Sequence, residues 1–216
     1  MNIKNYILEL LFPTYCIGCG KAKFLICADC LAGLKMSAGL GKIFYCFSYK
    51  NTPLVRKIIK QFKYKFNVDI ALVLGVALKD LFLEALKKNP ELYNATIVPV
   101  PIHKKRLKYR GFNQAGILAL SLYDGVKSEG RNGLNFAYMD CLIRQKFEEV
   151  QANLGRDERI KNLRGAIGLK KGANICGRVF VLVDDVYTTG ATTGECKKVL
   201  VGAGAKKVFV FCVAKS

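Results

Sequence analysis

Residues 179–193 read VFVLVDDVYTTGATT, an apolar run followed by two acidic residues, several hydroxyl-bearing residues and a glycine. The run Arg178–Asp184 predicts a buried parallel strand that ends in acid, and Thr192–Val201 predicts the helix that follows it. Ligands of open α/β sheets bind at the carboxyl ends of such strands. The N–H groups of a tight turn and the dipole of the next helix attract anions there, so the stretch predicts a phosphate-binding loop.

The two aspartates, Asp184 and Asp185, limit what the phosphate can be attached to. A carboxylate repels a phosphate, but it accepts hydrogen bonds from sugar hydroxyls and coordinates divalent cations. The stretch therefore predicts a ligand in which a sugar adjoins a phosphate. It lacks the Gly-Lys-Ser/Thr ending of a Walker A loop and the spacing of a dinucleotide-binding fingerprint. A capping turn without a ligand is the alternative, and the order of strand, acids, hydroxyls and helix disfavours it.

The remaining pattern predicts strands that alternate with helices, which is typical of a parallel sheet covered on both faces. The expected strands are Lys42–Tyr49, Thr96–Val100, Phe136–Ile143, Arg178–Asp184 and Lys207–Val213; the expected helices are 1–12, Leu54–Lys65, Ala71–Lys88, Asn113–Tyr123 and Thr192–Val201. Asp124–Asn135 is polar and predicts a loop, and Ala71–Lys88 is apolar nearly all round and predicts a buried helix. A chain of 216 residues can hold one core and a small appendage, which we place at 42–216 and 1–41.

Four of the nine cysteines form two doublets, Cys16-x-x-Cys19 and Cys27-x-x-Cys30. Two such turns supply four thiolates in a tetrahedron, which predicts a structural zinc site with no open coordination position. Two redox pairs, or cysteines spaced this way by chance, are the alternatives. The other cysteines are scattered, and Cys46 lies in an apolar run. With no recognisable signal peptide and no apolar stretch long enough to span a bilayer, the sequence favours a reducing cytoplasm and no integral membrane segment.

Charge points to a polyanionic partner. Thirty-five Lys and Arg against sixteen Asp and Glu give a net charge of +19, which attracts nucleic acid, phosphorylated ligands or an anionic membrane surface. A merely solvated, lysine-rich surface is the alternative. The helix Leu54–Lys65 collects Arg56, Lys57, Lys60 and Lys63 on one face. Aromatic residues lie in the same region, and single-strand binders combine basic grooves with aromatic platforms.

A second cationic segment follows the predicted strand Thr96–Val100. Pro99 and Pro101 give the chain a rigid exit from the strand. An exposed basic loop is expected next, and its residues crowd near the sheet edge that carries the phosphate loop: Lys104, Lys105, Arg106, Lys108 and Arg110. We interpret them as partners for a pyrophosphate, with an ordinary solvated loop as the alternative.

The run from Val179 to Thr193 resembles the signature of the type I phosphoribosyltransferases, which bind phosphoribosyl pyrophosphate with Mg²⁺. The resemblance implies that Asp184 and Asp185 meet the ribose hydroxyls. It also implies a phosphoribosyl site made by Asp184, Asp185, Val186, Tyr187, Thr188, Thr189, Gly190, Ala191 and Thr192, and a pyrophosphate site made by Pro101, His103, Lys104, Arg106 and Arg110. In an active enzyme Asp184, Asp185, Lys104, Arg106 and Arg110 would be catalytic, with Arg144 or Arg159 closing over the site.

The block VPVP at 98–101, the block RGFNQ at 110–114, the cysteine doublets and a later series together resemble the ComF family of competence proteins over nearly the whole chain. The series is Gln151, Leu154, Arg159, Asn162, Gly165 and Ala166. This resemblance implies a cytoplasmic protein that handles single-stranded DNA in natural transformation and contacts the inner-membrane uptake machinery, with a peripheral place at that membrane as the alternative. An active phosphoribosyltransferase of nucleotide metabolism remains a second hypothesis, and a zinc-containing nucleic-acid adaptor without a working pocket a third.

Overall fold

The computed structural model describes residues 13–34, 36, 39, 41–64, 69–130, 135–146 and 163–216. The expected helix at 1–12 lies outside these ranges. So do four residues of the family resemblance: Gln151, Leu154, Arg159 and Asn162.

A five-stranded sheet forms the centre of the protein, and every pairing in it is parallel. Its strand order is β1-β7-β6-β2-β3. The bounds are β1 Ile43–Ser48, β2 Ala95–Pro99, β3 Ala137–Tyr138, β6 Val179–Tyr187 and β7 Lys207–Lys215. The parallel α/β class expected from the alternation of strands and helices is thereby confirmed.

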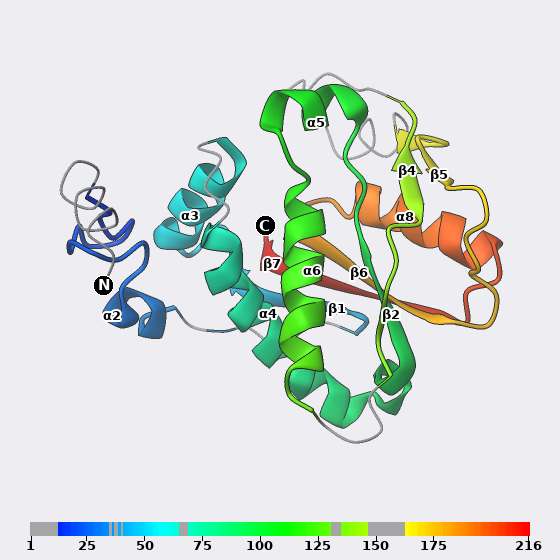
Figure 1. The fold of residues 1–216 in the computed structure, drawn as a ribbon, viewed down its shortest axis with the longest axis horizontal. Helices are drawn as coiled ribbons and strands as arrows, with labels where there is room; N and C mark the ends of the chain where they lie inside the picture. The colour runs from blue at the N-terminus through cyan, green and yellow to red at the C-terminus, as the bar shows by residue number, and fades with distance from the viewer. Residues whose placement is uncertain are drawn as a thin grey trace, which may run out of the picture.

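Helices cover both faces of this sheet (Figure 1). On one face lie α3 (Pro53–Tyr64), α4 (Asp69–Lys88) and α6 (Gln114–Lys127). On the other lie α8 (Ala191–Gly202) and a small antiparallel hairpin of β4 (Leu142–Arg144) and β5 (Ile167–Leu169). The remaining short elements are α2 (Ala28–Ala32), the 3-10 helix η1 (Pro90–Asn94) and α5 (Lys104–Arg110).

Alternation along β6 supplies both halves of the core. Val181 and Val183 are fully buried against the α4 and α6 side, while Phe180 and Leu182 are fully buried against the α8 side. Successive strand residues point to opposite faces, so a continuous apolar run is what a doubly covered strand requires. Each such side chain contributes about 1.5–3 kcal/mol by leaving water.

Three elements have other bounds than expected, and one helix is less buried. β6 continues through Tyr187, so its acidic residues lie inside the strand instead of ending it. α6 runs on into the expected loop as far as Lys127. The expected strand Phe136–Ile143 divides between β3 and β4, which belong to different sheets. α4 is not buried all round, because Leu72 and Val76 are 66% and 54% exposed.

The cysteine segment packs on the main domain beside α3. Ile17, Leu25 and Ile26 contact the same core cluster as the buried face of α3. Figure 1 shows this segment and α2 at the α3 end of the molecule. Among the described residues, no helix is both long enough and apolar enough to cross a membrane.

Candidate phosphate site and cysteine cluster

The chain leaves the neighbouring strands β2 and β6 in opposite directions. After β2 it passes through α5 and α6 to β3, at one edge of the sheet, and after β6 it passes through α8 to β7. Because α6 and α8 cover opposite faces, the chain connections diverge between the carboxyl ends of β2 and β6. We call this place the switch point; it is where open α/β sheets bind ligands. The segments that follow these two strands are the ones that the sequence pointed to.

β6 projects beyond β2 at this switch point. Its last partner on β2 is Pro99, opposite Val183, and the N–H of Val100 donates a final hydrogen bond to the Val183 carbonyl at 2.9 Å. From Asp184 to Tyr187 the strand pairs with β7 alone. We call Asp184–Tyr187 the β6 overhang. It places both carboxylates beside an open strand edge.

Within the overhang the two acids have different surroundings. The Asp185 N–H donates to Asp184 Oδ1 at 2.8 Å, and the Val186 N–H donates to Asp185 Oδ1 at 2.7 Å. Asp185 is 8% exposed, and its Oδ2 lies 2.8 Å from the Lys63 ammonium, which comes from the end of α3. Sequence reasoning placed Lys63 on the basic face of its helix and missed this ion pair.

Burial and charge shift the acid–base properties of this group. Burial, together with the negative charge of Asp185, raises the pKa of Asp184 to about 7, although Lys63 opposes the shift. Burial alone would lower the pKa of Lys63, but the neighbouring Asp185 carboxylate outweighs it and the pKa rises. At neutral pH the cluster therefore holds one ion pair and a second carboxyl group that is partly protonated.

The turn after the overhang has the geometry of an anion site. Gly190 caps α8 with φ +75°, a backbone conformation that favours glycine, and a Cβ there would lie 2.2 Å from the Tyr187 hydroxyl, which would have to shift. Thr189 Oγ1 accepts from the Ala191 N–H at 3.3 Å, and Thr193 Oγ1 donates to the Gly190 carbonyl at 3.2 Å. In the described part of the chain, no hydrogen bond uses the N–H groups of Thr189 or Gly190.

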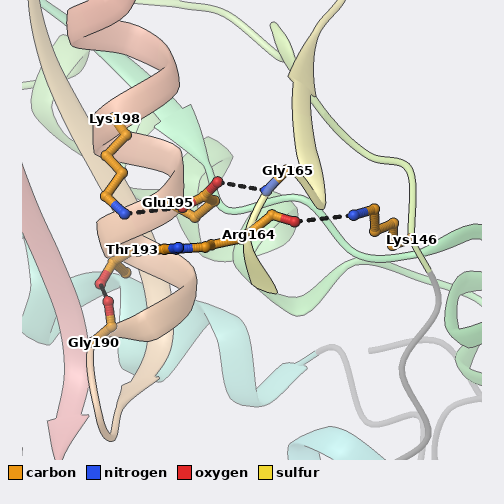
Figure 2. A network of polar contacts seen from close by, with 7 residues as sticks. All are labelled: Lys146, Arg164, Gly165, Gly190, Thr193, Glu195 and Lys198. Atoms are coloured by element: carbon orange, nitrogen blue, oxygen red, sulfur yellow. Dashed lines mark hydrogen bonds and ion pairs between the residues drawn. The ribbon is translucent and has the colours of Figure 1, made fainter. Parts of the chain in front are cut away.

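The first turns of α8 are tied to the segment that enters β5 (Figure 2). Glu195 accepts a hydrogen bond from the Gly165 N–H at 2.8 Å and lies 3.4 Å from Lys198. Lys146, just past β4, donates to the Arg164 carbonyl at 3.0 Å. These contacts hold the base of the β4–β5 hairpin against α8.

The hairpin also reaches the segment that follows β2. Arg144 pairs with His103 in an isolated parallel bridge, which brings the end of β4 beside the basic segment. Of the two arginines expected to close over the site, Arg144 therefore lies at its border. Arg159 is outside the described residues.

The basic segment is a helix, α5, and not the exposed loop expected from its composition. His103 caps it by accepting from the Lys105 N–H at 3.2 Å, and Gly111 ends it with φ +75°. Along this segment Pro101 is buried, Lys104 is exposed, and Arg106 is half-buried. A run of cations lacks apolar periodicity, so only the two caps marked the helix in the sequence.

Arg110 and the residues after it fix how α5 meets α6. The Asn113 side chain donates to the Val100 carbonyl at 3.1 Å, which ties the start of α6 to the end of β2. Arg110 donates to Gln114 Oε1 at 3.3 Å, and its guanidinium lies 5.5 Å from the centre of the Tyr64 ring on α3. Arg110 thus joins α5 to α3 next to Lys63.

The four doublet cysteines come together at the opposite end of α3. Their Sγ atoms all lie within 4.8 Å of one another, and Cys19 Sγ is 3.5 Å from Cys27 Sγ. Four sulfurs at about 2.3 Å from one zinc ion would be about 3.8 Å apart, so the cluster could hold such a metal. A Cβ on Gly18 would lie 2.5 Å from Cys30 Sγ, which explains the glycine in the first turn.

Hydrogen bonds favour the thiolate form of one cysteine of the cluster, Cys16. Backbone N–H groups of Cys19 and Cys27 lower the pKa of the Cys16 thiol to about 6, and the Cys27 N–H lies 3.3 Å from Cys16 Sγ. Thiolates are the form that binds zinc. All nine cysteines are free thiols.

Comparisons with known proteins place this architecture in a family. No protein-family model matches the chain. It is 30% identical over 203 residues to competence protein ComFC of Streptococcus pneumoniae, covering 93% of this chain and 80% of that protein. It is likewise 30% identical over 210 residues to competence protein F of Haemophilus influenzae, covering 95% and 86%. The chain belongs to the ComF family.

The chain is also similar to a DNA utilization protein and, in fold, to phosphoribosyltransferases of low sequence identity. The DNA utilization protein YhgH of Escherichia coli K12 is 29% identical over 164 residues, 76% of this chain and 68% of that protein. A hypoxanthine phosphoribosyltransferase of Staphylococcus aureus has a TM-score of 0.42 and 9% identity, covering 66% of this chain and 63% of that one. A hypoxanthine-guanine phosphoribosyltransferase of Bacillus anthracis also gives 0.42, with 14% identity and coverage of 66% and 69%.

Proposed function

We propose that this ComF protein handles single-stranded DNA in natural transformation and binds phosphoribosyl pyrophosphate with Mg²⁺ in its α/β domain. Family membership and the names of its relatives, competence protein and DNA utilization protein, support the first part. The observation that carries the second part is the β6 overhang, whose two acids are followed by a short turn and a glycine-capped helix at the switch point between β2 and β6.

In this proposal the ligand lies along the carboxyl edge of the sheet. Asp184 and Asp185 accept hydrogen bonds from the ribose hydroxyls, and the turn from Thr188 to Thr192 surrounds the phosphate on the sugar. The pyrophosphate lies toward Pro101, His103, Lys104, Arg106 and Arg110. Mg²⁺ would neutralise oxygens of the pyrophosphate, and the carboxylates of the overhang suit such a hard cation. The four cysteines would hold a structural zinc ion.

The proposed place of action is the cytoplasmic side of the inner membrane, in contact with the DNA-uptake machinery. The net charge of +19 supports a polyanionic partner, since proteins that neutralise phosphates with Lys and Arg gain most of their affinity from counterion release.

An active phosphoribosyltransferase is the second candidate function. The cationic helix α5 favours it, because this helix follows β2 and its Lys104, Arg106 and Arg110 could stabilise a departing pyrophosphate. Asp184 and Asp185 would then position the ribose for attack.

Two measurements test these proposals. Calorimetry with phosphoribosyl pyrophosphate and Mg²⁺ should show binding that is lost in the double variant Asp184→Ala, Asp185→Ala; equal binding by the double variant would remove the pocket proposal. A pyrophosphate-release assay with single-stranded DNA or nucleobases as acceptors separates the two functions. Release would establish an enzyme, and tight binding without release would favour a structural or regulatory ligand.

A further inference from the structure

A concave, cationic surface runs along α3, separate from the switch point. This α3 groove has a volume of about 530 Å³, within the range of ligand sites. Its lining consists of Tyr49, Pro53, Arg56, Lys57, Ile59, Lys60, Lys63 and Tyr64. Four of these side chains are cations, two are phenol rings, and none is acidic.

Helical spacing explains why the cations share one face. Arg56, Lys60 and Lys63 follow one another at intervals of four and three residues, and the opposite face of α3 is buried in the core. At a rise of about 1.5 Å per residue, the stretch from Arg56 to Lys63 is about 10 Å long. A nucleic-acid strand in a duplex carries one charge per about 3.4 Å, so this length reaches at least two phosphates.

The cations differ in how they are held. The Arg56 guanidinium donates to the carbonyls of Tyr49 and Lys50, which fixes it at the mouth of the groove. Lys57 and Lys60 are exposed, and no acidic residue of the described chain forms an ion pair with either. Their charges are therefore available to an external anion.

Aromatic rings distinguish this groove from a plain basic patch. Tyr64 is 56% exposed at the end of α3, with the Arg110 guanidinium 5.5 Å from its ring centre, and Tyr49 is half-buried at the other side. Bases of a single strand stack on such rings while its phosphates contact the cations. A flat anionic membrane surface would contact fewer of these cations than a strand that enters the concave groove.

Lys63 belongs to two sites at once. It lines the α3 groove, and its ammonium also lies 2.8 Å from Asp185 of the β6 overhang. An ammonium that moves toward a phosphate in the groove leaves Asp185 without its cation. The acid pair then carries more negative charge and attracts Mg²⁺ more strongly.

We propose that the α3 groove is the seat of single-stranded DNA, and that Lys63 couples its occupation to ligand binding at Asp184 and Asp185. The inference rests on the proposed function, which it deepens by locating the DNA and linking it to the pocket. The coupling is positive: each ligand strengthens the binding of the other by the same factor.

The first experiment measures the affinity of zinc-loaded, full-length protein for a fluorescein-labelled oligothymidine by anisotropy. Lys57→Gln with Lys60→Gln should weaken binding at least tenfold and flatten the dependence of log affinity on log salt by about 1.4, for two lost phosphate contacts. The matched control is Lys171→Gln with Lys206→Gln, which removes the same charge from two exposed lysines elsewhere; it should weaken binding less than threefold.

The possible outcomes distinguish a wrong location of the DNA site from a wrong assignment of the DNA-handling function. Wild-type protein that fails to bind the oligonucleotide would refute the DNA-handling function itself. If wild-type protein binds the oligonucleotide and both double variants bind it equally well, the DNA-handling function stands but the α3 groove is not the DNA site. If Lys57→Gln with Lys60→Gln loses binding to phosphatidylglycerol vesicles but binds the oligonucleotide as wild type does, the surface belongs to a membrane contact and the inference is overturned.

The second experiment tests the coupling. We expect saturating phosphoribosyl pyrophosphate with Mg²⁺ to tighten oligonucleotide binding about fivefold in wild-type protein, within the usual range for coupled sites. Lys63→Gln should abolish this factor, while Lys63→Arg, which keeps the charge, should preserve part of it. A factor of one in wild-type protein, or an unchanged factor in Lys63→Gln, would overturn the role of Lys63.

Discussion

Replacing Asp184 by asparagine should stabilise this protein at alkaline pH, although Asp184 is a proposed binding residue. Burial and the charge of Asp185 raise the pKa of Asp184 from 3.8 to about 7. The folded state therefore binds a proton that the unfolded state releases between about pH 4 and 7. As pH rises through this interval the free energy of unfolding falls, because the unfolded state gains the free energy of ionising this carboxyl group while the folded state keeps it protonated.

The size of the effect follows from the same interval. One pH unit corresponds to about 1.4 kcal/mol, so a pKa change from 3.8 to about 7 sets an upper bound of about 4 kcal/mol. Water reaches part of the Asp184 side chain, and screening reduces the cost of its charge. We expect Asp184→Asn to raise the free energy of unfolding by about 2 kcal/mol at pH 8 and by less than about 1 kcal/mol at pH 5.

The neighbouring acid provides a matched comparison with the opposite sign. Asp185 forms the ion pair with Lys63, and the two side chains are only 11% and 24% exposed. Asp185→Asn removes the partner of a largely buried ammonium, so it should lower the free energy of unfolding by about 2 kcal/mol or more. Two isosteric substitutions at adjacent positions should thus act in opposite directions.

Urea denaturation at pH 5 and pH 8, at constant ionic strength and with a thiol reductant, measures both effects. The chain contains no tryptophan, so far-ultraviolet circular dichroism is the suitable signal. Equal stabilities of Asp184→Asn and wild type at pH 8, or a shift of the same sign in Asp184→Asn and Asp185→Asn, would refute the account of the acid pair.

Three further predictions concern the ligand sites. Gly190→Ala should lower the free energy of unfolding by about 1–3 kcal/mol and weaken phosphoribosyl pyrophosphate binding, because it forces a positive φ on alanine. The control Gly194→Ala, in the first turns of α8 where a Cβ meets no neighbour, should be neutral or stabilising. Thermal melts measure the stabilities, and calorimetry measures the binding. Metal analysis should find about one zinc per chain, lost in Cys16→Ser but kept in Cys176→Ser; a metal-free wild type prepared without chelators would contradict this. Affinity for phosphoribosyl pyrophosphate with Mg²⁺ should rise about tenfold from pH 6 to pH 8 as Asp184 ionises. An equal rise in Asp184→Asn would show that the pH dependence comes from ionisation of the ligand and not of Asp184.

Local patterns in the sequence predicted those parts of the fold that depend on neighbouring residues. The apolar run before Asp184 and the glycine and threonines after it determine a strand, a turn and a helix by themselves. The spacing of the cysteine doublets was equally direct, because each pair closes one tight turn.

Contacts between distant segments could not be predicted in the same way. Lys63 and Asp185 come from different elements, and nothing in either local pattern indicates that α3 ends beside β6. The overhang of β6 depends on how far β2 extends, which is set by the prolines that end β2. α5 was missed because its stability depends on its caps and on its place beside α3, while its run of cations has no apolar face.

The sheet order has a consequence for how this protein is made. β1, near the beginning of the chain, lies at the edge of the sheet and finds its partner only in β7, at residues 210–215. During translation β1 is synthesised long before β7 and cannot form this pairing until β7 has been made. Pairings between segments so far apart in the sequence make folding slow. A premature stop before residue 207 would leave β1 unpaired and would take from Asp184 and Asp185 the strand that supports them.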